Sequence, residues 1–293
     1  MRIKFCGVRG SIASPGPDTI KYGGNTSCVY MSMNDGRQII LDAGTGIRKL
    51  GYDLYNSDGT LYILLSHFHW DHIQGFPFFL PNYEKGRKIR VFPCETRKNS
   101  YIYTLLDQMD GASFPVHSDD LPSKMDCLGA DIVDVTEREG WKISAKPLNH
   151  PGGGWAFRIE EDGVSMAYVT DNELDPPGKP QTSYDEWVEF LDGVDVLIHD
   201  AQYVEADMPH KHGWGHSLVS QVQQLAVDAN AQSLVLYHHD PDRIDSELDQ
   251  IGQEVHDFLK ANGSQGKSFC AMEGLVLDVK KNGDSGGSII ESV

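Results

Sequence analysis

Three histidines and an aspartate fall within six residues, in the run His67-Phe68-His69-Trp70-Asp71-His72. They directly follow residues 61–65, an apolar run whose length and boundaries predict a buried strand. We therefore expect the cluster at a strand's end, where loops carry chemistry on a rigid scaffold. Its spacing does not place the side chains on one face of a helix. It fits a tight loop around an ion, because imidazole and carboxylate groups are ligands of zinc-like metals.

Four ligand-type side chains in so short a loop exceed the needs of one open catalytic site, which takes about three protein ligands and leaves a position for water. The loop therefore predicts two divalent metal ions. Zinc suits these donors, and manganese or iron would accept the same nitrogen and oxygen atoms. The competing interpretation is a polar loop whose histidines only form hydrogen bonds.

Further histidines and aspartates stand at the ends of other predicted strands. Four such strand ends lie in the second half of the chain: His150 after residues 141–148, Asp171 after 164–170, His199-Asp200 after 194–198, and His238-His239 after 233–237. At the last of them, His238 and His239 are alternative metal ligands, and we favour His238 because it follows its strand directly.

The bulk composition is that of an ordinary soluble globular chain, with 40% hydrophobic and 23% charged residues in 293. No apolar run approaches the roughly 18 residues of a membrane span, and the first residues do not resemble a signal peptide. Five scattered cysteines, an odd number without paired spacing, fit reduced thiols better than a disulfide framework. These features predict a cytoplasmic protein without a membrane partner.

The charge balance is strongly acidic, with 25 basic and 43 acidic residues and a net charge of −18. Such a surface repels phosphate backbones, so a long nucleic-acid partner is not expected. Bound divalent ions would supply local positive charge that this count omits. The acidic net charge is therefore compatible with a small phosphate ester as the substrate.

Apolar runs and turn residues predict a strand-rich α/β chain that forms one domain over residues 1–281, followed by a flexible tail at 282–293. Two mixed sheets packed face to face, with helices outside, would bury both sets of strands. The expected strands are 3–8, 28–33, 38–41, 61–65, 88–92, 130–135, 141–148, 155–159, 164–170, 194–198, 233–237 and 275–279. The expected helices are 47–56, 100–110, 183–191, 218–230 and 244–262.

The motif His67-x-His69-x-Asp71-His72, followed in order by His150, Asp171 and His238, resembles the metallo-β-lactamase superfamily. The resemblance covers nearly the whole chain and implies an αββα sandwich with a dinuclear site at the rim between the sheets. By the family pattern, His67, His69 and His150 would bind one metal. Asp71, His72 and His238 would bind the other, and Asp171 would bridge the two.

Asp71 and Asp171 point to the phosphodiesterase branch of that superfamily, which includes tRNase Z-like nucleases, cyclic-nucleotide phosphodiesterases and PhnP-like enzymes. In this branch, Gly215-His216-Ser217 looks like the segment whose histidine protonates the leaving oxygen. Asp200 occupies the place of the acidic residue that orients that histidine, where family nucleases often have Glu. We therefore assign catalytic roles to His216, Asp200 and Asp71; the alternative for His216 is a purely structural place at the start of a helix.

Three further polar residues have two interpretations each. Asn25, after Gly23-Gly24, would donate to a phosphate oxygen or merely form a tight turn. His212, in a histidine-dense loop with His210, would contact the substrate or lie on the surface. Asp42 would brace the metal loop or cap a helix.

The expected function is hydrolysis of a phosphodiester bond in a small substrate such as a cyclic nucleotide. Two metal ions about 3.5–4 Å apart would share an attacking hydroxide, and His216 would protonate the leaving oxygen. The alternatives are a tRNase Z-like ribonuclease and a non-catalytic metal- or ligand-binding protein on the same fold. The chain lacks the basic arm with which tRNA-processing relatives grip tRNA. A homodimer is compatible by analogy with relatives.

Overall fold

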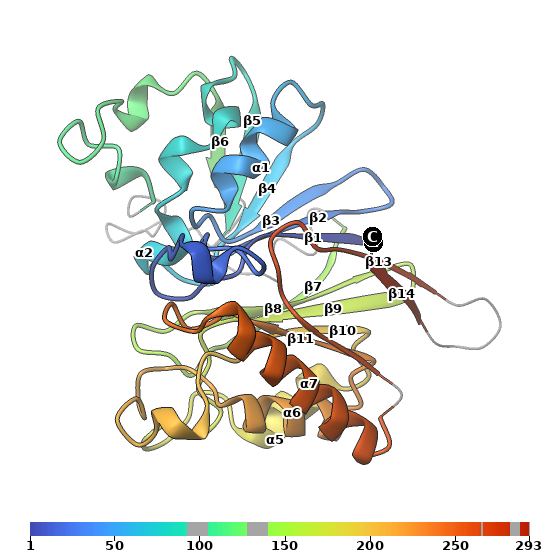
Figure 1. Ribbon diagram of the computed structural model, residues 1–293. Coiled ribbons are helices and arrows are strands. Elements are labelled where there is room, and N and C mark those ends of the chain that lie inside the picture. The colour runs from blue at the N-terminus through green and yellow to red at the C-terminus, as the bar shows by residue number, and fades with distance from the viewer. Residues whose placement is uncertain (93–104, 128–139, 265, 282–287, 293) are drawn as a thin grey trace.

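The structure, a computed structural model, describes residues 1–92, 105–127, 140–264, 266–281 and 288–292, and this part of the chain forms two mixed sheets (Figure 1). The first sheet has the order β14-β13-β1-β2-β3-β4-β5-β6. Its strands β3 to β6 are parallel, and β1 is antiparallel to β2 and β13. The strands are β1 (Arg2–Gly7), β2 (Cys28–Ser32), β3 (Gln38–Leu41), β4 (Leu61–Leu64), β5 (Lys88–Phe92), β6 (Lys124–Cys127), β13 (Val276–Lys281) and β14 (Ser288–Ser292).

The second sheet has the order β12-β11-β10-β9-β8-β7. Strands β9 to β12 are parallel, whereas β7, β8 and β9 form an antiparallel meander. The strands are β7 (Lys142–Pro147), β8 (Trp155–Glu161), β9 (Val164–Val169), β10 (Val196–Asp200), β11 (Ser233–Tyr237) and β12 (Lys267–Cys270).

Helices cover the outer face of each sheet, so the predicted αββα sandwich is confirmed (Figure 1). Helices α1 and α2 lie beside the first sheet, and α5, α6 and α7 lie beside the second. The helices are α1 (Ile47–Leu54), α2 (Trp70–Ile73), α5 (Tyr184–Leu191), α6 (Val219–Asp228) and α7 (Asp245–Ala261), with short 3-10 turns at Pro17–Thr19, Phe76–Phe78, Leu80–Tyr83, Ser118–Asp120 and Glu205–Asp207. Across the described ranges, no helix is long and apolar enough to cross a membrane.

A continuous apolar core fills the space between the two sheets. Phe5 and Met31 enter it from the first sheet, and Phe157 and Tyr168 from the second. Strands β9 and β11 are buried at every position, which explains why they appear in the sequence as largely apolar runs. Two further cores lie under the helices on the outer faces. This packing fixes the strand ends that carry the polar site.

The strands that the sequence did not predict lie at sheet edges. Strands β6 and β12 have polar or half-exposed residues and lack the apolar run that marks a buried strand. The segment predicted to be a flexible tail contains β14, which pairs antiparallel with β13. The flexibility of the tail stays a prediction. The predicted strand at 130–135 and residues 100–104 of the predicted helix at 100–110 lie outside the described residues.

Replacement of Phe157 tests the core between the sheets. Its ring is fully buried and meets Phe92 edge-on, with ring centroids 6.0 Å apart. Phe157→Ala should lower the free energy of unfolding by about 3–5 kcal/mol, because it removes a buried ring and leaves a cavity. Phe78, which is 54% exposed, is the matched control, and Phe78→Ala should cost about 1 kcal/mol or less. Urea denaturation measures both; equal losses would contradict this core.

Candidate dinuclear metal centre

The carboxyl ends of strands from both sheets meet at one edge of the sandwich, and each places polar side chains there. This convergence explains how residues far apart in the sequence form one site. His67, His69, Asp71 and His72 follow β4, His150 follows β7, Asp171 follows β9, Asp200 ends β10 and His238 follows β11.

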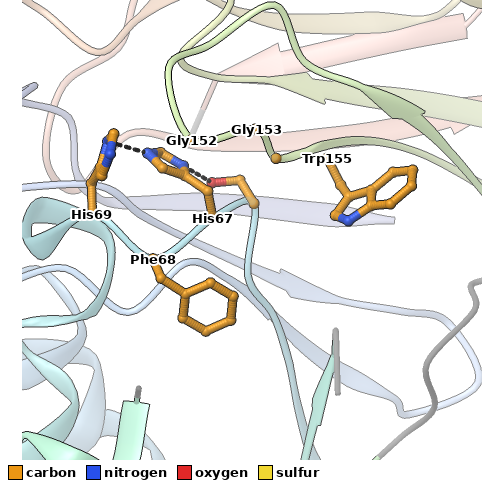
Figure 2. A pocket seen from close by; sticks show the side chains of 8 residues that line it. His67, Phe68, His69, Gly152, Gly153 and Trp155 are labelled. Carbon is orange, nitrogen blue, oxygen red and sulfur yellow. Dashed lines mark hydrogen bonds between the residues drawn. The ribbon is translucent and has the colours of Figure 1, made fainter. Parts of the chain in front are cut away.

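The first group of converging ligand atoms comes from His67, His69, His150 and Asp171, and these atoms all lie within 4.8 Å of one another. Nδ1 of His69 lies 3.0 Å from Nε2 of His67 (Figure 2). The same atom lies 3.0 Å from Nε2 of His150. Oδ1 of Asp171 lies 3.7 and 3.8 Å from the same two Nε2 atoms. Ligands of one tetrahedral ion are roughly 3.3–3.6 Å apart when each is about 2.0–2.2 Å from it, so the group has the size of one ion site.

The second group comes from Asp71, His72, His238 and, again, Asp171. Oδ2 of Asp171 lies 3.1 Å from Nε2 of His72 and 3.2 Å from Nε2 of His238. Oδ2 of Asp71 lies 3.2 and 3.1 Å from the same nitrogens. The two oxygens of Asp171 thus point to different groups, as a bridging carboxylate requires.

Acceptors behind the histidines fix which ring nitrogen faces the site. The Nδ1 atoms of His67, His72, His150 and His238 lie near Ser66 Oγ (3.1 Å), Asp42 Oδ2 (2.8 Å), Gly215 O (3.0 Å) and Gln202 Oε1 (2.9 Å), respectively. Each Nδ1–H can donate to its acceptor, which leaves the lone pair of Nε2 for a metal, as in most histidine metal sites.

The electrostatics of the site also suit cations. Burial lowers the pKa of His67 well below its usual value and that of His150 to about 4, so both rings are neutral ligands at neutral pH. Burial opposes ionisation of Asp71 and Asp171, but the surrounding histidines hold the pKa of each carboxyl well below its usual value. The site therefore combines buried carboxylates with lone-pair nitrogens.

One atom provides a direct test of whether metal ions fit. Nε2 of His72 is buried and has no hydrogen-bond partner among the described residues, although two carboxylates lie near it. A buried polar atom without a partner is costly in a folded protein. A divalent ion held by His72, Asp71, Asp171 and His238 would satisfy it, and the donor set is that of zinc-like ions. The residues present therefore fit two divalent ions.

Asp42 braces the metal loop and does not cap a helix. Its carboxylate accepts hydrogen bonds from Ser66 N (2.7 Å), Ser66 Oγ (2.8 Å), His72 Nδ1 (2.8 Å) and Tyr168 Oη (2.8 Å). Helix α1 begins after Gly46 and has no side-chain cap. The sequence left these two roles open, and nothing in it indicated Tyr168, which reaches Asp42 from the opposite sheet.

Three buried non-glycine residues at the site adopt left-handed backbone conformations: Asp42 (φ 60°), Asp171 (φ 51°) and His238 (φ 58°). Asp42 and His238 directly follow β3 and β11, and Asp171 lies two residues beyond the end of β9. The turn redirects each side chain into the site. Such conformations cost on the order of 1–3 kcal/mol each and persist where the surrounding structure holds them. Three of the seven non-glycine residues with positive φ in the described ranges therefore lie at the metal groups.

His216 lies beside the metal groups, and its Nδ1 is 2.8 Å from Oδ2 of Asp200. Burial acts against a charged imidazole, but Asp200 raises the pKa of His216 to about 9. Glu173, which the sequence did not single out, accepts hydrogen bonds from the backbone of Gly213 (2.8 Å) and Gly215 (2.9 Å). It thereby fixes the loop that presents His216, and only its position two residues after Asp171 hinted at a role.

The remaining predicted residues lie nearby with other partners. Asn25 donates from its backbone N and its Nδ2 to Glu273 (2.7 and 2.9 Å), so its amide is already engaged. His212 is partly exposed, and its Nε2 lies 2.9 Å from the carbonyl of Asp175. Their substrate-binding roles stay predictions. His239 turns away from the metal groups, with Nε2 2.8 Å from the carbonyl of Ala271.

Comparison with protein families matches residues 37–239 to the beta-lactamase superfamily domain. This range spans the metal loop, His150, Asp171, Asp200 and His216, and ends at His239.

Individual proteins are similar to this chain over most of its length, in sequence or in structure. Ribonuclease Z of Natronomonas pharaonis is 23% identical, with 85% of this chain and 92% of the relative aligned. A diphosphatase of the PhnP family superposes with a TM-score of 0.63 at 18% identity, over 95% of this chain and 98% of the other. The short form of human tRNase Z superposes with a TM-score of 0.58 at 18% identity, over 95% and 99%.

The neighbouring histidines His238 and His239 offer a matched test of the second metal group. His238→Ala should reduce bound metal from two ions per chain toward one, because it removes a ligand whose Nε2 faces Asp71 and Asp171. His239→Ala should retain both ions. Elemental analysis of the purified variants, with circular dichroism to verify folding, makes the measurement; the opposite pattern would show that the second group is wrongly assigned.

Proposed function

Because the chain belongs to the metallo-β-lactamase superfamily and is a metal-dependent hydrolase of its phosphodiesterase branch, we propose that it cleaves a phosphodiester in a small molecule such as a 3′,5′-cyclic nucleotide. The observation that carries the proposal is the pair of ligand groups joined by Asp171, with the Asp200–His216 pair beside them. We further propose zinc as the metal, since both groups combine imidazole nitrogen with carboxylate oxygen.

When bound, two divalent ions would polarise the phosphate oxygens and lower the pKa of a water molecule. The chain's own residues do the positioning. His67, His69 and His150 hold one side of the site, and His72 and His238 hold the other. The two carboxylates Asp71 and Asp171 would offset part of the cation charge. A phosphodiester at the site would then meet local positive charge despite the acidic chain.

His216 is suited to protonate the departing oxygen. Its Nδ1–H donates to Asp200, which leaves Nε2 as the atom that gives up a proton. The departing alkoxide needs a proton, and the nearby carboxylate stabilises the charged imidazole before transfer. Asp200 is itself held by the backbone N of Gln202 (3.0 Å) and Asn172 (3.3 Å), so the pair has a fixed orientation.

The acidic balance supports a small substrate. A net charge of −18 disfavours a long polyanion, whose binding depends on many basic contacts. A small phosphodiester needs only the local field of the metal site.

A second candidate is a ribonuclease that processes tRNA, and it is favoured by one observation. The relatives from Natronomonas pharaonis and Haloarcula marismortui, both ribonuclease Z, align over 85% and 88% of this chain. The ligand groups of this chain are compatible with either substrate. The two candidates therefore differ in the size of the polyanion that binds.

The role of His216 predicts a dependence on the leaving group. His216→Ala should lower kcat by about 10²–10⁴-fold for a 3′,5′-cyclic nucleotide, whose alkoxide needs a proton. The loss should be much smaller for bis(p-nitrophenyl) phosphate, whose phenolate departs unprotonated. His210→Ala, at an exposed histidine of the preceding loop, is the control. Equal losses for both substrates would contradict the proton-donor role.

The choice of substrate is tested by direct competition between the two candidates. Metal-loaded protein should hydrolyse bis(p-nitrophenyl) phosphate and a cyclic nucleotide, and it should leave a 3′-extended precursor tRNA intact at low salt, where charge contacts are strongest. His67→Ala, which removes a ligand of the first group, should abolish hydrolysis. Cleavage of the precursor tRNA on a gel would establish the ribonuclease instead, and a metal-replete protein inert to every phosphodiester would refute both.

A further inference from the structure

A pocket of about 190 Å³ opens directly beside the first metal group. Its wall includes His67 and His69, so it is continuous with the site where the phosphate would bind. The volume is below the roughly 300–1,000 Å³ of pockets that hold a whole ligand. The pocket therefore suits one substituent of the phosphodiester.

Aromatic side chains form two of the walls. In Figure 2, His67 and His69 lie on one side of the pocket and Trp155 on the other, with Phe68 below and Gly152 and Gly153 above. Phe68 stands between two metal ligands in the sequence, and its ring is half-buried. Flat apolar walls of this kind favour a flat ring, since every nucleobase can stack on an aromatic face.

Trp155 is held at the metal loop by the backbone. Its N–H donates to the carbonyl of Ser66 at 2.8 Å, which joins the start of β8 to the residue before His67. Gly154 permits this approach, because a Cβ there would lie 3.0 Å from Ser66 O and 3.1 Å from His67 Cβ. The indole itself is 38% exposed, and in the described part of the chain no ring contact or hydrogen bond engages it. A buried-core role therefore does not explain its position.

Gly152, Gly153 and Gly154 form a further wall of the pocket, where only backbone atoms line it. Gly152 and Gly153 adopt φ values of 90° and 78°, and they carry no side chain into the pocket. Among the described residues, the N–H groups of Gly152 and Gly154 lack a hydrogen-bond partner. Such donors can form hydrogen bonds with the nitrogen and oxygen acceptors at the edge of a nucleobase. An aliphatic substituent has no acceptor for them.

We propose that this pocket is the base subsite of the enzyme, in which a nucleobase stacks on Trp155 and Phe68 while the phosphate occupies the metal centre. This rests on the proposed function and narrows it, because it makes nucleotide phosphodiesters the substrate class in preference to phosphodiesters without a base. Trp155 is then the residue that selects the substrate, without taking part in the chemistry.

Binding of adenosine 5′-monophosphate and ribose 5-phosphate to the metal-loaded full chain tests the subsite, since the two probes share phosphate and sugar and differ by the base. Calorimetry should show tighter binding of the nucleotide. Trp155→Ala should weaken nucleotide binding by about 5- to 150-fold, the usual effect of one lost base–aromatic stack, and leave ribose 5-phosphate unchanged. Trp155→Phe should restore most of the affinity, and Tyr52→Ala, at a 57% exposed aromatic on α1, should change neither probe.

The outcomes separate the subsite from the proposed function. Equal affinities for the two probes, or an equal loss of both in Trp155→Ala at unchanged metal content, would overturn the subsite even if phosphodiesters are hydrolysed. Selective loss of the nucleotide in a protein that hydrolyses no phosphodiester would uphold the subsite and overturn the proposed function. Neither outcome depends on turnover, so the two claims fail independently.

Discussion

The buried carboxylate of Asp171 is the group on which the rest of the site depends. One oxygen faces the His67, His69 and His150 group and the other faces His72 and His238. A buried charge is strongly destabilising unless it is paired, and Asp171 lies beside a second buried carboxylate, that of Asp71. Two divalent ions would stabilise this arrangement, because they would bind the carboxylates and the histidine lone pairs together. Metal binding should therefore contribute to stability as well as to catalysis.

The sandwich provides this arrangement by bringing strand ends from both sheets to one edge. The core between the sheets fixes the strands, and left-handed turns at Asp42, Asp171 and His238 direct the last residues inward. A layer of acceptors behind the histidines then orients each ring. Asp42 extends this layer across the sandwich, because it binds His72 from the first sheet and Tyr168 from the second. The site is thus supported by side chains from both sheets.

Much of this was predictable from the sequence, and the reason is local chemistry. The run from His67 to His72 has a spacing that suits a metal loop, and the apolar runs before it and before His150, Asp171 and His238 located the strand ends. Contacts that join distant segments had no such signal: Gln202 behind His238, Glu173 behind Gly215 and Tyr168 behind Asp42 are ordinary polar or aromatic residues in the sequence. The edge strands β6 and β12 were missed because half-exposed strands carry weak hydrophobic patterns. The sequence likewise did not indicate a role for Trp155, because only the fold places it beside His67.

Anomalous diffraction from crystals grown with zinc tests the central claim most directly. Two anomalous peaks are expected about 3.5–4 Å apart, one among His67, His69 and His150 and the other among Asp71, His72 and His238, with one oxygen of Asp171 directed to each. A single peak, or two peaks that share no contact with Asp171, would contradict the bridged dinuclear centre.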